Sequence, residues 1–262
     1  QPDRVHFYPF SLTRSLTEIR AGIFTIQERW ESILNTNCQV YTSTYLQGLY
    51  TTTFLDHEDA VVFINVTCIP DESIKNALFN LIEGASLLDE DGKWIATHTS
   101  ERSLGNILLG DPNLKTTIPA KFIKNATHLL QINAALIQSD FNQVTANKTS
   151  IVVDASNRLI SPENIFIEPG AVLSGVSLNA TEGPIYIGKN ALVMEGVAVR
   201  GPFVLGEKAV VKMNACIYGA SSVGPFCTIG GEIKNSILMG YSNKAHEGYL
   251  GDSIIGQWCN LG

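Results

Sequence analysis

Every sixth residue is aliphatic along a stretch in the second half of the chain. Eight consecutive positions follow this rule: Ile187, Val193, Val199, Leu205, Val211, Ile217, Val223 and Ile229. The residue four positions after each one is mostly small, and glycine follows every third aliphatic residue, at Gly188, Gly206 and Gly224. A six-residue period repeated in threes is typical of a three-sided parallel β-helix, in which each hexapeptide forms one short strand and a corner.

This pattern predicts how the solenoid packs. The aliphatic side chains should point into a narrow interior and stack on the same positions of neighbouring coils. The glycines at the corners are expected to adopt positive φ angles, which cost glycine nothing. An ordinary β-sandwich with fortuitous spacing is the alternative, and the length of the run argues against it.

The six-residue pattern breaks after Ile229 and resumes at Ile255 and Leu261. The polar groups of the segment between them are Lys234, Lys244, His246, Tyr249 and Asp252. Loops on a rigid scaffold commonly carry function. We therefore expect this segment to bulge out of the solenoid as a loop that bears functional groups.

Helical and strand patterns alternate in the first half of the chain. The expected helices span residues 23–34, 70–83 and 129–144, and the expected strands span residues 39–43, 60–66 and 94–97. Such alternation is typical of an α/β layer with a parallel or mixed sheet. The chain should thus contain an α/β domain at residues 1–156 and a solenoid at residues 157–262, with residues 157–163 as the linker.

Composition and charge narrow the classes of partner. A hydrophobic fraction of 45% and a charged fraction of 16% fit a packed globular protein. The net charge of −7 argues against unspecific binding of nucleic acid or of an anionic membrane. Without an apolar run of about 18 residues, no membrane-spanning segment is expected. Five scattered cysteines without a C-x-x-C motif favour free thiols in a reducing compartment, and hence a cytoplasmic protein.

Two sets of motifs resemble a known family. The segments Glu232-Ile-Lys234, Lys244-Ala-His246-x-x-Tyr249-Leu-Gly-Asp252 and Asn260-Leu-Gly262 resemble the acetyltransferase signature of the bifunctional N-acetylglucosamine-1-phosphate uridylyltransferase/glucosamine-1-phosphate acetyltransferase family, in its divergent Bacteroidetes-type form. The segments Pro9-Phe-Ser-Leu-Thr-Arg14 and Arg20-Ala-Gly22 resemble its sugar nucleotidyltransferase domain less specifically. The resemblance implies a nucleotidyltransferase-like, Rossmann-like α/β domain followed by a left-handed parallel β-helix of hexapeptide repeats.

The resemblance also implies roles for residues of the polar segment. His246 would be the general base that accepts the proton of the sugar amine as it attacks acetyl-CoA. Lys234 would hold the sugar phosphate as a point charge, while Tyr249 and Asn260 would hydrogen-bond the substrate. Each role has a structural alternative: a bonded loop histidine, a solvated lysine, a tyrosine that caps an apolar coil, and an asparagine that ladders between coils.

The sequence also departs from the family. Tyr218 stands where the family has an arginine that grips phosphate, and the coenzyme residues would lie beyond Gly262, so we expect a C-terminally incomplete solenoid. The usual Gly-x-Gly-Thr-Arg loop is absent, and no carboxylate follows the central strand until Asp71. Arg14 and Arg20 are candidates for binding a nucleotide phosphate. The alternative is that each forms a structural ion pair. Mg²⁺ would serve such a domain, but no residue is assigned as a metal ligand.

Three functions remain open. The first is acetyl transfer from acetyl-CoA to an amino-sugar 1-phosphate in nucleotide-sugar synthesis. The second is uridylyl or thymidylyl transfer from a nucleoside triphosphate to a sugar 1-phosphate, with the β-helix used for assembly. The third is a non-catalytic trimeric scaffold that binds metabolites. The predicted solenoid resembles those of β-helix proteins that form homotrimers. A homotrimer is therefore expected under each of the three functions.

Overall fold

The computed structural model describes residues 2–51, 53, 59–102, 107–108, 111 and 114–262. These residues form two compact units. The first comprises Gln1–Glu18 and Ile26–Asn125, and the second comprises Ile19–Thr25 and Ala126–Gly262. The units do not coincide with the predicted division between residues 156 and 157.

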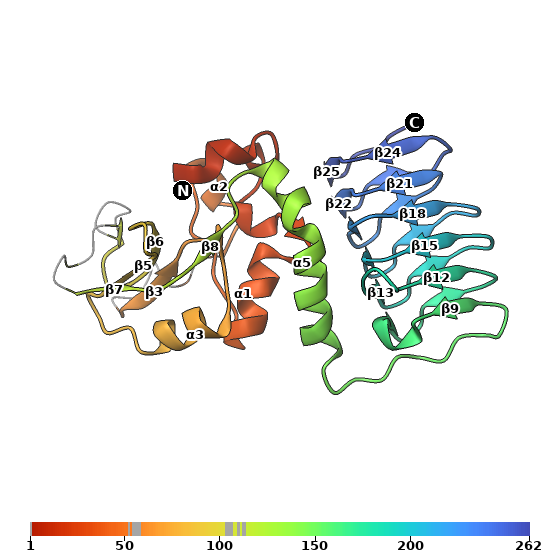
Figure 1. The fold of residues 1–262 in the computed structure, drawn as a ribbon. Coiled ribbons are helices and arrows are strands. Elements are labelled where there is room, and N and C mark those ends of the chain that lie inside the picture. The colour runs from red at the N-terminus through yellow and green to blue at the C-terminus, as the bar shows by residue number, and fades with distance from the viewer. Residues whose placement is uncertain (1, 52, 54–58, 103–106, 109–110, 112–113) are drawn as a thin grey trace. The chain divides into compact units, whose positions relative to one another are not determined.

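The first unit contains a mixed sheet, as the alternating pattern predicts (Figure 1). Its strand order is β3 (Val61–Ile64), β6 (Trp94–Thr99), β5 (Ser86–Leu88) and β7 (Lys115–Thr117). Strand β6 pairs antiparallel with β3 and β5, whereas β5 and β7 are parallel. A second, two-stranded sheet joins β4 (Cys68–Ile69) and β8 (Lys121–Phe122).

Helices flank these strands in the sequence. They are η1 (Pro2–Phe7), η2 (Phe10–Leu12), η3 (Leu16–Glu18), α1 (Ile26–Leu34), α2 (Thr44–Gln47) and α3 (Glu72–Phe79). Helix α3 starts where its acidic first turn predicts, because the Asp71 side chain caps it by accepting a hydrogen bond from the Ile74 amide at 2.9 Å. Helix α1 begins three residues later than expected, after strand β2 (Phe24–Thr25).

The strand expected at residues 39–43 does not form. Its backbone groups bond to a side chain instead of a neighbouring strand: the Gln47 amide donates to the Val40 carbonyl at 2.9 Å and accepts from the Thr42 amide at 2.8 Å. Because one glutamine satisfies both groups, residues 39–43 lie in an irregular conformation.

The second unit contains the predicted left-handed parallel β-helix, seen as stacked coils in Figure 1. Its first sheet is built from β10 (Ile165–Ile167), β13 (Ile185–Ile187), β16 (Phe203–Leu205), β19 (Ser221–Val223), β22 (Ile237–Gly240) and β25 (Ile254–Gln257). Its second sheet is built from β11 (Val172–Leu173), β14 (Leu192–Val193), β17 (Val210–Val211), β20 (Thr228–Ile229) and β23 (Asn243–Lys244). Its third sheet is built from β9 (Arg158–Ile160), β12 (Ser177–Asn179), β15 (Ala198–Arg200), β18 (Cys216–Tyr218), β21 (Glu232–Lys234) and β24 (Tyr249–Gly251).

The solenoid already begins inside the segment that the sequence predicts as a linker. Strand β9 pairs with β12, and the short helix η5 (Pro162–Asn164) turns the chain into β10. Residues 157–163 are therefore part of the first coil.

The period-six residues line the interior as predicted, since all eight are at most 3% exposed. The corner glycines have a different role from the expected one. Positive φ angles occur at Asn190, Lys208 and Phe226, and not at the three corner glycines. Glycine is needed because successive coils touch there: a Cβ atom on Gly224 would lie 2.1 Å from the Met239 carbonyl oxygen.

The segment after Ile229 is not a bulging loop, contrary to the sequence-based expectation. Its strands stay in register with the preceding coils: Ile217 pairs with Ile233, and Ile233 with Leu250. These partners are sixteen and seventeen residues apart, whereas Ile185 pairs with Phe203, eighteen residues later. Shorter coils break the six-residue pattern in the sequence while the stacking continues.

Helix α5 (Ala126–Thr145) packs against the first sheet of the solenoid. Asn133 is fully buried, donates from Nδ2 to the Ala220 carbonyl at 2.8 Å, and accepts at Oδ1 from the Gly22 amide at 2.7 Å and the Ser222 hydroxyl at 3.1 Å. Gly22 links strands β1 (Arg20–Ala21) and β2. Apolar contacts around this polar centre involve Ile23, Ile137, Phe141, Phe166 and Val204.

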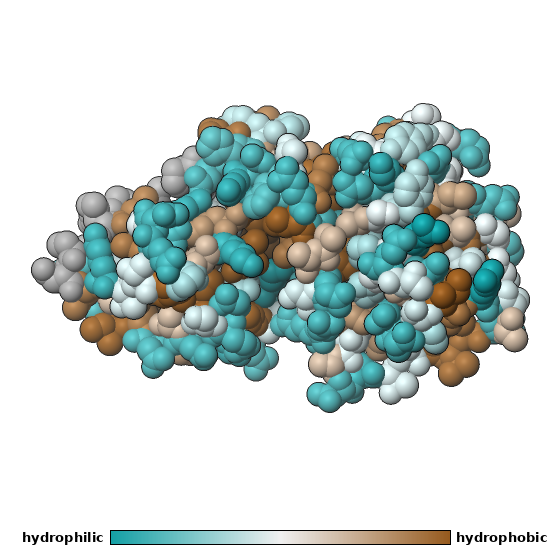
Figure 2. All heavy atoms as spheres, in the orientation of Figure 1, coloured by the Kyte–Doolittle hydropathy of each residue, from teal (hydrophilic) through white to brown (hydrophobic). Residues whose placement is uncertain are grey.

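Three aromatic rings stack along one corner of the solenoid. The centroids of Phe226 and Tyr241 are 5.0 Å apart, and those of Tyr241 and Trp258 are 4.5 Å apart, with nearly parallel planes. Elsewhere the visible surface mixes hydrophilic residues with small hydrophobic patches (Figure 2). Among the described residues, none of the helices has the length and apolarity needed to cross a membrane.

Candidate active site on the third sheet of the solenoid

Lys234 and Tyr249 lie on neighbouring strands of the third sheet. Glu232 of β21 pairs with Tyr249 of β24, and Lys234 pairs with Gly251. Because Ile233 and Leu250 between them point into the interior, the side chains of Lys234 and Tyr249 point outwards. Both are exposed, so this face presents an ammonium group and a phenol side by side to solvent.

Gly251 lets the Tyr249 ring lie against the sheet. A Cβ atom on Gly251 would lie only 2.1 Å from the Tyr249 hydroxyl oxygen. The phenol therefore extends over Gly251, whose partner in the sheet is Lys234. The absence of a side chain at this position leaves room for the hydroxyl beside the residue that pairs with Lys234.

Tyr218 occupies the adjacent position on β18, where it pairs with Lys234. Its hydroxyl donates a hydrogen bond to the Glu232 carboxylate. This bond, with smaller contributions from desolvation and from the negative charge of Glu232, raises the pKa of Tyr218 to about 12. At neutral pH the face thus carries a neutral phenol and a carboxylate where the family resemblance implies a cationic arginine.

His246 lies in the corner that connects β23 to β24. Its side chain is exposed, and Tyr249 follows three residues later on the third sheet. The corner wraps around a buried neighbour: Lys244 is 7% exposed and its Nζ donates to the carbonyls of His246 and Gly248, each at 2.7 Å. At the next turn, Asn235 donates to the Asp252 carboxylate at 2.6 Å, which gives Asp252 a role in the turn.

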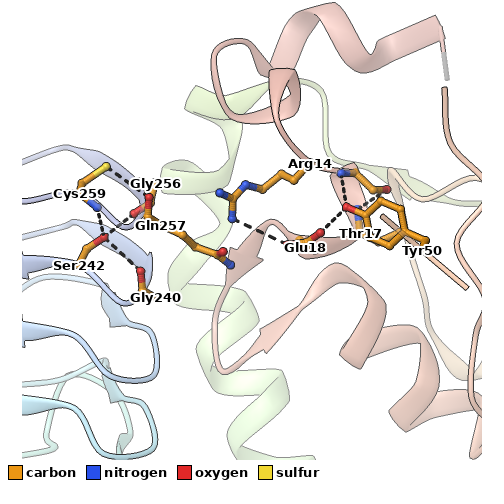
Figure 3. A network of polar contacts seen from close by, with 10 residues as sticks. Arg14, Thr17, Glu18, Tyr50, Gly240, Ser242, Gly256, Gln257 and Cys259 are labelled. Carbon is orange, nitrogen blue, oxygen red and sulfur yellow. Dashed lines mark hydrogen bonds and ion pairs between the residues drawn. The ribbon is translucent and has the colours of Figure 1, made fainter. Parts of the chain in front are cut away.

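Asn260 lies beside the second sheet and not in the third. It forms an isolated bridge with Asn243, whose Nδ2 donates to Asn260 Oδ1 at 3.0 Å. This is the ladder geometry that the sequence left open as the alternative. The same coil is tied by Ser242, whose hydroxyl lies 2.8 Å from the Gly256 carbonyl and accepts from the Cys259 amide at 2.9 Å (Figure 3).

Arg14 and Arg20 belong to different compact units, and each has local partners. Arg14 lies 3.8 Å from the Glu18 carboxylate, which also accepts a hydrogen bond from the Tyr50 hydroxyl (Figure 3). Arg20 donates from Nη1 to the Ile23 carbonyl within the β1–β2 turn. In the described structure both guanidinium groups thus contribute to local structure.

A cavity of about 1190 Å³ lies within the first unit. Within the described part of the chain, four residues that line the cavity carry a buried polar atom without a hydrogen-bond partner: Thr17 Oγ1, Trp30 Nε1, Thr42 Oγ1 and Ser43 Oγ. Sequence reasoning missed these groups, because it assigned residues 39–43 to a strand and residues 23–34 to a helix without a polar role for Thr42, Ser43 or Trp30. The residues that carry these buried atoms line the cavity together with largely apolar side chains.

The described residues of the first unit do not fit a Mg²⁺ site. The carboxylate of Asp3 lines the cavity but lies 3.4 Å from the Lys93 ammonium. Across the described ranges, no three His, Cys, Asp or Glu side chains come together in an arrangement suited to a metal ion. A hard divalent cation prefers several oxygen ligands, which these side chains do not supply.

Comparison with known proteins agrees with this two-part fold. A sequence model of the sugar nucleotidyl transferase family matches residues 1–149. The bifunctional protein GlmU of Synechococcus elongatus is 31% identical over 123 residues, which cover 44% of this chain and 27% of that protein. GlmU of Clostridium acetobutylicum is 28% identical over 156 residues, covering 53% of this chain and 34% of that protein.

A third relative, GlmU of Thermodesulfovibrio yellowstonii, is 33% identical over 100 residues, which cover 31% of this chain and 22% of that protein. The matched regions thus span at most about a third of the length of these relatives. The family match covers more than half of this chain. The chain therefore belongs to the sugar nucleotidyl transferases, a family of transferases, and its β-helix marks it as a divergent relative of GlmU.

Proposed function

We propose that the solenoid transfers an acetyl group from acetyl-CoA to the amine of an amino-sugar 1-phosphate such as glucosamine 1-phosphate. The observation that supports this proposal best is the register of β21 and β24. It puts Lys234 and Tyr249 at diagonal positions of neighbouring strands on one open face, and Tyr249 follows the corner that bears His246. A general base, a cation and a hydroxyl donor are the groups that this reaction needs.

In the proposed reaction His246 acts as the general base. The amine nitrogen attacks the carbonyl carbon of the thioester, so that a C–N bond forms and the C–S bond breaks. The proton leaving the amine passes to the imidazole, and the thiolate of coenzyme A departs. Histidine suits this task because its unperturbed pKa lies near neutrality.

The neighbouring side chains would hold the acceptor. Lys234 attracts the phosphate as a compact charge with three donors, and the Tyr249 hydroxyl bonds the phosphate or the sugar. Asn260 lies beside the second sheet, where it bonds Asn243, so this acceptor site does not include it. In a homotrimer, which we also propose, coils of neighbouring subunits would complete the coenzyme site.

The second candidate is uridylyl or thymidylyl transfer by the N-terminal domain, with residues 1–156 as the functional unit. The family match at residues 1–149 and the unpartnered polar groups of the cavity favour nucleotide-sugar binding there. Arg14, which belongs to the same unit as the cavity, would assist with phosphate. Because the described carboxylates do not fit Mg²⁺, acetyl transfer remains the lead proposal.

Mass spectrometry of the products separates the candidates. The chain is incubated with acetyl-CoA and a panel of amino-sugar 1-phosphates, and in parallel with nucleoside triphosphates and sugar 1-phosphates. An N-acetylated sugar phosphate supports the lead proposal, whereas pyrophosphate and a nucleotide sugar support the second. Binding without any product would favour a trimeric metabolite-binding scaffold.

A further inference from the structure

Lys244 occupies an interior position of the solenoid that other coils fill with an aliphatic residue. In the second sheet it pairs with Ile229, which is fully buried and pairs in turn with Val211. Lys244 itself is 7% exposed. Desolvation lowers the pKa of its ammonium group, because burial disfavours the charged form.

The buried ammonium group uses its three donors on backbone carbonyls. Nζ lies 2.9 Å from the Gly230 oxygen, 2.7 Å from the His246 oxygen and 2.7 Å from the Gly248 oxygen. Gly230 belongs to the preceding coil, whereas His246 and Gly248 belong to the corner between β23 and β24. One side chain therefore joins two carbonyls of this corner to one carbonyl of the preceding coil.

An apolar residue would fill the interior more cheaply than a buried charge. The hydrogen bonds from Lys244 to the carbonyls of His246 and Gly248 explain why a lysine stands here, because an aliphatic side chain could not form them. Nearby glycines leave room for this arrangement: a Cβ atom on Gly231 would lie 2.9 Å from Lys244 Nζ and 2.6 Å from the Gly248 oxygen.

We propose that Lys244 is a positioning residue that fixes the backbone of the corner at residues 245–248 and thereby aims the His246 imidazole at the acceptor on the third sheet. The inference rests on the proposed acetyl transfer. His246 lies in a segment without strand pairing. The hydrogen bond from Lys244 Nζ to the His246 carbonyl therefore links the interior of the solenoid to the residue that carries the base. Lys234 and Tyr249 lie on strands and do not depend on it.

The test compares Lys244→Met, which keeps the length and the apolar volume, with Lys189→Met, which removes an exposed lysine of the same solenoid. Amide hydrogen exchange is measured on the full chain. Lys244→Met should speed exchange of the Glu232 amide, which donates to the Gly248 carbonyl of the corner at 3.1 Å, and leave the strands of other coils unchanged, and Lys189→Met should change neither. Unchanged exchange of the Glu232 amide overturns the proposal, and so does loss of protection throughout the solenoid.

Kinetics supply the readout that a purely structural lysine would not move. Lys244→Met should lower kcat by roughly 10- to 100-fold, the effect of misplacing a reacting group by about 1 Å. The KM of the sugar phosphate should stay unchanged, because Lys234 remains in place. Lys244→Arg retains donors for the carbonyls and should recover part of both the protection of the Glu232 amide and kcat.

The two proposals fail in different ways. If wild-type protein transfers no acetyl group, the proposed function fails, and the exchange experiment still decides whether Lys244 orders the corner. If wild-type protein is active and Lys244→Met keeps its kcat, the positioning role is overturned while the proposed function stands.

Discussion

The hydroxyl of Tyr218 donates a hydrogen bond to the carboxylate of Glu232, one coil further along the third sheet. The pair lies next to Lys234 on the face that we propose as the acetyl-transfer site. It provides a neutral donor and a negative charge where the resemblance implied an arginine. In the proposed reaction, phosphate recognition on this face would therefore depend on Lys234.

Replacing Glu232 by Gln should lower the pKa of Tyr218 from about 12 towards its ordinary value of 10.0. A raised pKa means that the bond stabilises the fold below the unfolded-state pKa and that this contribution is lost as pH rises through about 12. The phenolate absorbance is titrated in wild-type protein and in Glu232→Gln, and Tyr218→Phe identifies the signal. Equal Tyr218 pKa values in wild type and Glu232→Gln would contradict the hydrogen bond.

Replacing Lys234 by Met should weaken binding of the sugar phosphate. A hydrogen bond to a charged group contributes about 1.5–3 kcal/mol, so KM should rise by roughly 10- to 100-fold with a smaller change in kcat. Steady-state kinetics measure both constants, and the exposed Lys189→Met is the matched control. A KM that does not move would assign Lys234 to the solvated surface.

Asn133 should be essential for the packing of α5 on the solenoid. Asn133→Ala leaves the Gly22 amide, the Ala220 carbonyl and the Ser222 hydroxyl without this partner, and we expect a loss of about 3 kcal/mol in the free energy of unfolding. Urea unfolding measures it. Asn142→Ala, an exposed change on the same helix, should cost less than about 0.5 kcal/mol. Similar losses for both variants would refute the assignment.

The aromatic stack should stabilise the last coils. Tyr241 contacts a ring on either side, and each aromatic pair contributes about 0.5–1.5 kcal/mol beyond burial. Tyr241→Ala should therefore lower the free energy of unfolding by about 1–3 kcal/mol, whereas Tyr241→Phe should keep most of it. Thermal unfolding compares the two, and equal stability of both variants would speak against the stack.

The solenoid could be predicted because its interior repeats one simple choice. Every sixth position from Ile187 to Ile229 requires an aliphatic side chain, and the structure buries all eight of these residues. The later coils escaped the same reasoning for two physical reasons. They are one to three residues shorter, and Lys244 stands in an interior position where a hydrogen-bonded cation replaces an aliphatic residue.

Other features depend on distant contacts that local patterns do not encode. The Gln47 side chain forms hydrogen bonds with the Val40 carbonyl and the Thr42 amide, so residues 39–43 stay irregular despite their strand-like composition. Asn133 bonds to residues 111 and 89 positions away, at Gly22 and Ser222, which no helical pattern reveals. For the candidate site, the motif indicated Lys234 and Tyr249 together, whereas the placement of Asn260 beside another sheet follows only from the coil register.

The rate of acetyl transfer by wild-type protein and by His246→Ala tests the central claim most directly. Release of coenzyme A thiol is followed with acetyl-CoA and glucosamine 1-phosphate, and unfolding curves confirm that both proteins are folded. We predict turnover in the wild type and a fall of roughly 10²- to 10⁴-fold in kcat for His246→Ala, as expected for loss of a general base. Equal rates for the two proteins, or no turnover by folded wild-type protein, would contradict the account.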